Sequence, residues 1–362
     1  MKFKPTVLLV AVLVSLGLLL GTSTAQAATV IKVAAEGDTL PDDTILMDIL
    51  LNGGVAINLY GQVAFGGRDA DGTDAVFTQA GKVVEEGETL PDDTILAKLR
   101  GRGQVAISAG QSGDTVTFHG DGEAEEGDYD TDAVFTQDGV VAAVGDTLAE
   151  GTLDQINDRG KVAINYWNEV AFHGSVEIES EFENSESDHF RAVFISDGLD
   201  TLVVAREDTD LPDETPLKYI TESGGVAISD MGEVAFHGRT ADPASGRLPD
   251  KAVFTSNGLI AKESDNLPDG TNLDNINTYG GVAINLFGDV VFQGRTGGDE
   301  AVFTQNGLVA KVGDILEDGT TLSEISDIAG VAINPYGREV AFLGKAGPNA
   351  VFVGQAPLPP AP

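Results

Sequence analysis

The residues best suited to chemistry are two groups of aspartates at matching places along the chain. The segments RDADGTDAVF and EGDYDTDAVF supply them, and the members are Asp69, Asp71, Asp74, Asp128, Asp130 and Asp132. Alternate residues of an extended strand share one face, so their carboxylates can converge on a hard cation such as Ca²⁺. The helix-flanked loop of an EF-hand is absent. The pattern leaves two interpretations open, solvated acidic loops or a Ca²⁺ site, and Ca²⁺ is the one candidate cofactor.

Three histidines form a second candidate set. His119, His173 and His237 each follow the phenylalanine of a VTF or VAF triplet, where Gly66 and Gln293 stand in other copies. Imidazole is a common ligand of Zn²⁺. Equivalent positions on successive repeats diverge from a common axis, however, so we expect half-exposed residues at strand ends and no zinc site.

These residues are carried by a repeat. The triplet VAI starts at positions 55, 105, 162, 226, 282 and 331, and AVF starts at 75, 133, 192, 252, 301 and 350. VAF or a close variant stands between them, and an element such as KVVEEGETL follows AVF. Self-similarity at about 50 residues indicates a repeat architecture. Each unit is predicted to form four short strands, which we name a (VAI), b (VAF), c (AVF) and d (KVVEEG).

Turn residues separate these strands at regular places. Between a and b, Asn58 and Gly61 form an Asn-x-x-Gly turn, and Asn168 replaces that glycine in the third unit. Both residue types tolerate left-handed backbone. Between c and d stand Asp-Gly or Asn-Gly pairs in most units. These pairs are the strongest hairpin signals, so the strands are predicted to be antiparallel.

The strands are apolar on both faces. In VAF, Val63 and Phe65 occupy one face and the small Ala64 the other. Stacked propeller blades require sheets buried in this way. After its first 28 residues the chain carries a d-type strand, TVIKVAAEGDTL, and its last repeat holds only a, b and c. The first strand can therefore complete the last blade and remove an exposed edge.

We therefore expect an all-β protein, a six-bladed β-propeller of four-stranded antiparallel blades closed by the N-terminal strand. A β-solenoid is the alternative, although its rungs are usually shorter than this repeat.

The repeat resembles a family of exported bacterial tandem-repeat proteins named for the motif NxxGxVAF. The matching residues of the first and fifth units are Asn58, Gly61, Val63, Ala64, Phe65, Asn285, Gly288, Val290 and Phe292. The second and fourth units depart, with Ser108 and Ser229 in place of asparagine. The resemblance covers nearly the whole chain and implies an exported propeller-like protein, in a family whose biochemical role is mostly undefined. Its members often end in a sorting signal, which the tail PLPPAP does not resemble.

The N-terminal segment is typical of a secretory signal peptide. Two lysines precede an apolar run from about residue 7 to 20, and AQA at 25–27 offers a cleavage site. We expect a signal peptide over 1–27, one propeller domain over 28–354 and a Pro-rich disordered tail over 355–362. An uncleaved anchor is the alternative, but the run is short for a span of about 20 residues. The mature protein would then have no membrane span.

The charge balance of the chain limits the classes of molecule that it can bind. The chain has 58 Asp and Glu against 21 Lys and Arg, a formal net charge of −37, and no cysteine. Such a surface repels phosphate backbones, so nucleic acid is excluded as a partner. With the signal peptide, this composition predicts a secreted or extracytoplasmic protein, in the periplasm, at the cell surface or outside the cell.

No nucleophile elbow, phosphate loop, zinc signature or dinucleotide fingerprint is present, so catalytic residues stay unknown and an enzyme activity stays open. In a propeller with strand a innermost, the b–c and d–a connections share one face. The b–c connections hold 9, 14, 19, 15, 8 and 7 residues, and the d–a connections carry acidic runs such as LPDDT.

Loops on a rigid scaffold often carry function. We expect a binding or structural module that recognises an extracellular protein or glycan through the variable b–c loops, with Ca²⁺ as a candidate assisting ion. The alternative is a carbohydrate-active enzyme that uses two carboxylates at the mouth of the channel.

Overall fold

A computed structural model describes residues 34–49, 55–58, 60–100, 105–108, 114–123, 131–157, 161–178, 188–221, 224–240, 249–316, 319–326, 330–346 and 349–357. The chain divides into two units, Met1–Lys32 and Val33–Pro362. The predicted signal peptide lies in the first unit, outside the described residues.

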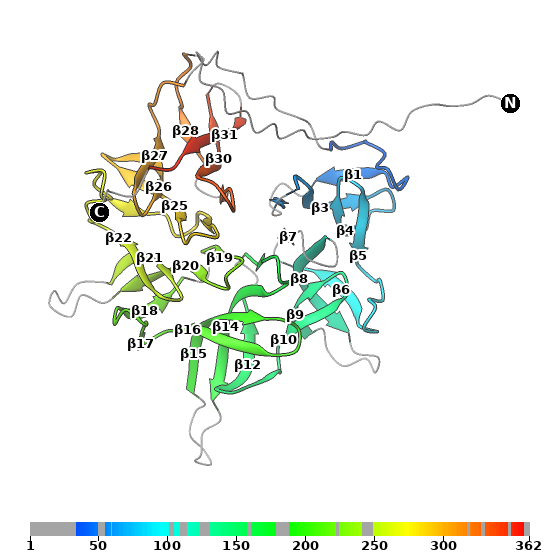
Figure 1. Cartoon of the computed structure of the whole chain (residues 1–362). Helices are drawn as coiled ribbons and strands as arrows, with labels where there is room; N and C mark the ends of the chain where they lie inside the picture. The colour runs from blue at the N-terminus through cyan, green and yellow to red at the C-terminus, as the bar shows by residue number, and fades with distance from the viewer. Residues whose placement is uncertain are drawn as a thin grey trace. The chain divides into compact units, whose positions relative to one another are not determined.

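The second unit is a six-bladed β-propeller, as the sequence predicts (Figure 1). Every paired strand is antiparallel. Across the described ranges there is no helix, and hence none that is long and apolar enough to cross a membrane.

The described residues of the first three blades form sixteen strands. Blade 1 holds β1 (Leu46–Ile49), β2 (Val55–Ile57), β3 (Val63–Asp69), β4 (Asp74–Thr78) and β5 (Gly81–Glu85). Blade 2 holds β6 (Ile95–Leu99), β7 (Val105–Ser108), β8 (Thr115–Glu123), β9 (Thr131–Thr136) and β10 (Gly139–Ala143). Blade 3 holds β11 (Thr147–Leu148), β12 (Gly151–Ile156), β13 (Ala163–Ile164), β14 (Val170–Ile178), β15 (Asp188–Ser196) and β16 (Thr201–Arg206).

In the last three blades, the part of the chain that is described forms fifteen strands. Blade 4 holds β17 (Thr209–Asp210), β18 (Pro216–Ile220), β19 (Val226–Ile228), β20 (Val234–Thr240), β21 (Asp250–Thr255) and β22 (Gly258–Lys262). Blade 5 holds β23 (Asn275–Ile276), β24 (Val282–Ile284), β25 (Val290–Thr296), β26 (Asp299–Thr304) and β27 (Gly307–Lys311). Blade 6 holds β28 (Glu324–Ile325), β29 (Val331–Ile333), β30 (Glu339–Lys345) and β31 (Asn349–Gln355).

The innermost strand of each blade is broken in two, which the sequence did not predict. In blade 5, β24 pairs with the first half of β25 and β23 with its second half, so residues 277–281 form a bulge opposite Gln293. The other blades repeat this pairing. Part of each predicted d–a connection is therefore strand. The single b-strand residue opposite each bulge has no strand partner on that side.

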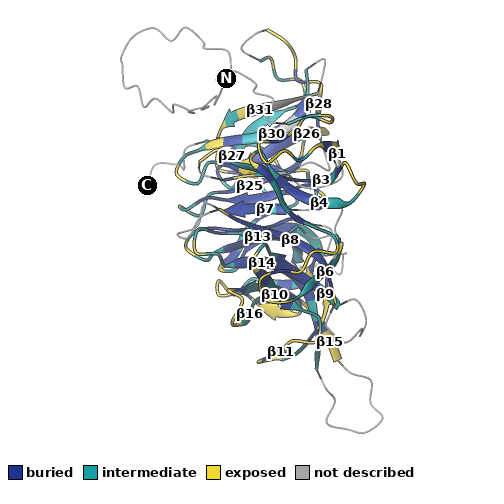
Figure 2. Ribbon diagram, turned by 90° about the vertical axis from the view of Figure 1, so that its right-hand side faces the viewer, coloured by how far each residue is buried: buried dark blue, intermediate teal, exposed yellow. Residues whose placement is uncertain are grey.

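Large and small faces meet between blades, as predicted. Ala171 of blade 3 packs in one cluster with Val234 and Phe236 of blade 4. Blades 1 and 2, 2 and 3, 4 and 5, and 5 and 6 share clusters of the same kind. Within each blade the b and c phenylalanines stack, with ring centroids 5.1–5.8 Å apart. Figure 2 shows these strands as the buried layer of the unit. Burying apolar sheet faces against each other is the main stabilising term here.

The a–b turns follow the predicted chemistry. Asn58 Oδ1 accepts hydrogen bonds from the backbone N–H groups of Tyr60 and Gln62, both at 3.0 Å. Gly61 and Asn168 adopt positive φ, 81° and 65°, as their residue types allow.

The two ends of the propeller compare with the predicted boundaries as follows. The strand expected to close the ring falls mainly on residues 28–33, outside the described residues. At the other end β31 continues through Gln355, which pairs with Glu339, and the N–H of Ala356 donates to Arg338 O at 2.8 Å. The last blade thus extends two residues into the segment expected as a tail.

Candidate functional site

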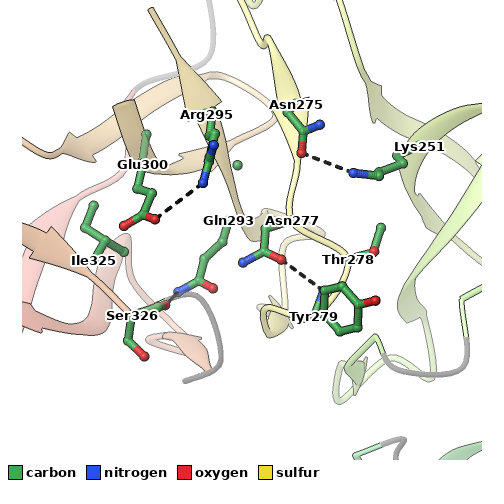
Figure 3. Close-up of a pocket in the computed structure, with 12 residues that line it drawn as sticks. Lys251, Asn275, Asn277, Thr278, Tyr279, Gln293, Arg295, Glu300, Ile325 and Ser326 are labelled. Atoms are coloured by element: carbon green, nitrogen blue, oxygen red, sulfur yellow. Dashed lines mark hydrogen bonds and ion pairs between the residues drawn. The ribbon is translucent and has the colours of Figure 1, made fainter. Parts of the chain in front are cut away.

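A polar cavity of about 120 Å³ lies on blade 5, where it faces blades 4 and 6. It is lined by Lys251, Asn275, Asn277, Thr278, Tyr279, Gln293, Gly294, Arg295, Glu300, Ala301, Ile325 and Ser326 (Figure 3). Arg295 and Glu300 flank the β25–β26 turn, which is the b–c connection of this blade. The cavity therefore lies at the end of the blade where the b–c connections emerge.

The bulge of strand a positions half of the lining. Asn275 stands in β23 opposite Arg295, and its Oδ1 accepts a hydrogen bond from Lys251 Nζ at 3.3 Å. Asn277 begins the bulge, and its Oδ1 accepts the N–H of Tyr279 at 3.1 Å. This contact turns the chain and leaves the Tyr279 ring 67% exposed beside the opening. A tight asparagine turn thus presents two amides and one phenol to the same space.

Gln293 forms the floor of the cavity opposite the bulge. Its side chain is buried, at 2% exposure, and its Nε2 donates to Ser326 O of blade 6 at 2.9 Å. Its Oε1 is buried without a hydrogen-bond partner among the described residues. A buried amide oxygen normally has a partner, so this atom is available to accept a hydrogen bond from a donor in the cavity.

Charged groups at the rim are mutually paired. Arg295 Nη2 lies 3.6 Å from Glu300 Oε1, and Lys251 Nζ lies 3.5 Å from Glu263 Oε1. The Arg295–Glu300 ion pair stabilises the fold little, because both of its side chains are partly exposed. Its effect is to present a guanidinium and a carboxylate side by side. The cavity can donate and accept hydrogen bonds within a few ångströms while carrying little net charge.

The corresponding cavity of blade 3 is nearly closed. It measures about 10 Å³ and is lined by Gln155, Asn157, His173, Gly174, Ser175, Arg191 and Ile220. His173 stands where blade 5 has Gln293, and Ser175 where blade 5 has Arg295. The repeat thus builds one kind of inter-blade space, and the side chains of each blade decide whether it stays open.

The first predicted aspartate group is occupied by cations of the chain itself. Asp69 is buried, and its carboxylate accepts the N–H groups of Asp71 and Thr73 and a hydrogen bond from Lys82 Nζ at 3.1 Å. Burial raises the pKa of Asp69, but the Thr73 and Lys82 hydrogen bonds outweigh it and lower the pKa overall. Asp74 forms an ion pair with Arg68 at 2.6 Å.

Only part of the second group is within the described residues. Asp128 and Asp130 lie outside them. Asp132 contacts Arg100 at 3.2 Å and His119 Nε2 at 3.5 Å. Burial raises the pKa of Asp132, but His119 and Arg100 outweigh it and lower the pKa. In the part of the chain that is described, no three His, Asp or Glu side chains are grouped to hold a metal. Calcium binding stays a prediction.

The histidines are not half-exposed, so that prediction is wrong. His119, His173 and His237 are buried, at 2% exposure or less, because each stands opposite the bulge of its blade rather than at a strand end. Both ring nitrogens of His173 and His237 are buried without hydrogen-bond partners in the described residues. Burial lowers the pKa of His173 to about 4. Burial, with the charges of His173 and Lys161, lowers the pKa of His237 to about 3.

The acidic LPDDT segments are not free binding loops either. The first aspartate after each Leu-Pro turns back to cap the c–d hairpin of its own blade by accepting a backbone N–H group. These bonds join Asp42 to Lys82, Asp92 to Val140, Asp213 to Leu259 and Asp269 to Leu308, at 2.8–2.9 Å. The leucine before each Pro is buried. The repetition of LPD therefore has a structural cause.

The blade 5 cavity was not singled out from the sequence. Its signals are weak: asparagines alternate in NINTYGG, and glutamine replaces histidine at position 293. Neither identifies a site without the bulge, which brings residues 275–279 against the ends of β25 and β26.

Comparison with solved structures finds two propellers and a lectin among the similar proteins. The β-propeller domain of the Trilobed protease from Pyrococcus furiosus is 10% identical, with 85% of this chain and 84% of that one covered and a TM-score of 0.41. A variant of Aleuria aurantia lectin in complex with alpha-methyl-L-fucoside is 10% identical, covering 85% and 97%, with a TM-score of 0.37. The Dos1 propeller is 12% identical, covering 83% and 67%, with a TM-score of 0.36.

No curated protein is significantly similar in sequence. The pattern of a family of unknown function, DUF7453, matches residues 19–346.

Proposed function

The chain belongs to the DUF7453 family, whose function is unknown, and from that premise we propose that it is an exported glycan-binding propeller that takes one sugar residue in the blade 5 cavity. The observation that carries the proposal is the composition of this cavity: amides, a guanidinium, a carboxylate, a phenol and an unpartnered buried amide oxygen converge on about 120 Å³.

Size and polarity favour a sugar. The volume is below the roughly 300–1,000 Å³ of typical small-molecule sites, so it suits one ring rather than a cofactor. Sugar hydroxyls donate and accept at once, which matches alternating groups such as Arg295 and Glu300. The exposed ring of Tyr279 offers an apolar face beside them. A protein partner would be expected to use a larger and flatter surface.

Binding is favoured over hydrolysis. Hydrolysis of a glycosidic bond by a carboxyl pair needs two such groups about 5–9.5 Å apart. Among the described residues that line the cavity, Glu300 is the one carboxylate. The alternative of a carbohydrate-active enzyme therefore has no support at this cavity.

The test is a screen of the whole secreted protein on an array of immobilised glycans, followed by calorimetric titration of the sugars that bind. Arg295→Ala and Asn275→Ala should each weaken binding tenfold or more, because hydrogen bonds to a charged or buried group are lost. Arg68→Ala is the matched control, since Arg68 holds the same b-strand position in blade 1. Failure of every glycan to bind, or equal affinity of Arg295→Ala and wild type, would refute the proposal.

A further inference from the structure

The a–b turns at the other end of the blades carry a feature that the glycan proposal does not use. Five large apolar side chains at the same turn position are 53–76% exposed: Tyr60, Trp167, Met231, Phe287 and Tyr336. The a–b turn of blade 2, over residues 109–113, lies outside the described residues. A side chain that merely capped a blade would be buried, whereas these face solvent. Contiguous exposed apolar groups usually mark an interaction site.

These turns surround an axial pocket of about 140 Å³. The last residue of VAI forms its wall in five blades: Ile57, Ile107, Ile164, Ile228 and Ile284. Asn58, Ser108, Asn165, Ser229 and Asp230 add polar groups to it. Apolar cavities of about 150 Å³ hold a benzene ring, so the axial pocket has room for one large aliphatic or aromatic side chain.

Carboxylates outnumber basic side chains in the described a–b turns around the axial pocket. Glu169, Glu233, Asp289 and Glu339 end the turns and accept hydrogen bonds from the neutral amides of Asn165, Asn257, Asn285 and Asn334. Asp230 accepts the backbone N–H of Tyr166 at 3.0 Å. Arg338 is the one basic residue in the described a–b turns. These carboxylates complement a cationic partner, and exposed Trp, Tyr and Phe rings attract cations as well.

We propose that this face, the axial pocket with its ring of Tyr60, Trp167, Met231, Phe287 and Tyr336, binds a cationic peptide segment that inserts one leucine or phenylalanine into the pocket. Charge complementarity selects lysine or arginine around that anchor. Aromatic residues and an anchored apolar side chain are the usual energetic centre of such contacts. The proposal stands apart from glycan binding, because the two sites have no lining residue in common.

Trp167 allows a direct measurement, because it is the one tryptophan of the chain and belongs to the ring. The probe is the synthetic peptide acetyl-Gly-Lys-Lys-Leu-Lys-Lys-Gly-amide, titrated into the full protein while tryptophan emission is recorded. We expect saturable binding with a blue-shifted emission, weakened as salt screens the carboxylates. A second peptide with serine for leucine, and a third with glutamate for lysine, should bind at least tenfold more weakly.

The variant Met231→Ser with Phe287→Ser should lose at least tenfold in affinity and still fold, since both side chains are exposed. The matched control is Leu199→Ser with Ile315→Ser, which removes two apolar side chains outside the ring that are at least as exposed. Arg295→Ala should leave peptide binding unchanged.

Three results would overturn the proposal. The first is no binding of the lysine–leucine peptide, or equal binding of the serine peptide. The second is equal affinity of the Met231→Ser/Phe287→Ser variant and wild type. The third is a wild-type dimer in sedimentation velocity that this variant converts to a monomer, because the ring would then be covered by a second copy of the chain.

Discussion

Replacing His173 and His237 by glutamine should remove most of the acid sensitivity of this fold between pH 7 and pH 5. Both imidazoles are buried opposite the bulges without partners in the described residues, so the folded state holds them neutral. Glutamine is the natural residue at the same position in blade 5, where Gln293 donates to the carbonyl of Ser326. Thr221 follows β18 directly, as Ser326 follows β28.

The direction in which stability changes with pH follows from proton binding in the folded and unfolded states. A histidine in the unfolded chain has a pKa of about 6.5. In the folded protein burial lowers the pKa of His173 to about 4, and burial with the charges of His173 and Lys161 lowers that of His237 to about 3. As the pH falls below about 6.5, the unfolded state takes up protons that the folded state refuses. Stability is therefore complete above that pH and falls as the folded pKa values are approached.

The loss of unfolding free energy at pH 5 is set by the interval of about 1.5 pH units between this pH and the pKa of histidine in the unfolded chain. At about 1.4 kcal/mol per unit, each histidine costs about 2 kcal/mol of unfolding free energy, and the pair about 4 kcal/mol.

The measurement is urea unfolding at pH 7 and pH 5 for the wild type and for His173→Gln/His237→Gln. Urea is chosen because it leaves charge screening unchanged. At each pH the folded wild type and the folded double variant carry nearly the same net charge. The effect of electrostatic self-repulsion therefore cancels when the two proteins are compared. If the double variant loses as much free energy between the two pH values as the wild type, the histidines are not the acid-sensitive groups.

Three further predictions rest on the blades. Asp269→Ala should cost about 1 kcal/mol in thermal unfolding because the cap on Leu308 is lost, while Asp299→Ala should not; equal midpoints would contradict the cap. Calcium at the Asp69 loop has to displace Lys82, so Ca²⁺ should raise the melting temperature of the Lys82→Gln variant more than Mg²⁺ does at equal ionic strength. If Ca²⁺ has no larger effect than Mg²⁺ on the variant or on the wild type, the site is excluded. Gly238→Ala should destabilise the protein by about 1–3 kcal/mol, because the new Cβ would lie 2.6 Å from Tyr219 O; a circular dichroism melt like that of wild type would refute this reasoning.

Some of the architecture follows from local chemistry. Asn58 and Gly61 make their turn from their own side chain and backbone freedom, so the hairpin could be predicted from residue types alone. Val63, Ala64 and Phe65 alternate large and small within one triplet, which predicts a sheet buried on both faces. These signals act over a few residues and recur six times, so repetition reinforces them.

Other features depended on contacts between segments far apart in the sequence. The bulge of strand a is invisible in the sequence, because it arises where five residues must pass one b-strand residue on the way to the axis. It buries His173 and His237, which isolated strands would leave half-exposed. Asp69 and Asp74 of the first group looked like cation ligands, yet Lys82 and Arg68 already form ion pairs with them.

By itself, then, the sequence determined the repeat, the turns and the two-faced burial of each strand, because those are set by residue type and spacing within one hairpin. Only the tertiary structure decided which side chains share a space. The blade 5 cavity joins Lys251, Arg295 and Ser326 from three blades, and the axial pocket joins residues from all six. Pockets form between blades, and which blade faces meet is decided when the sheets pack around the axis.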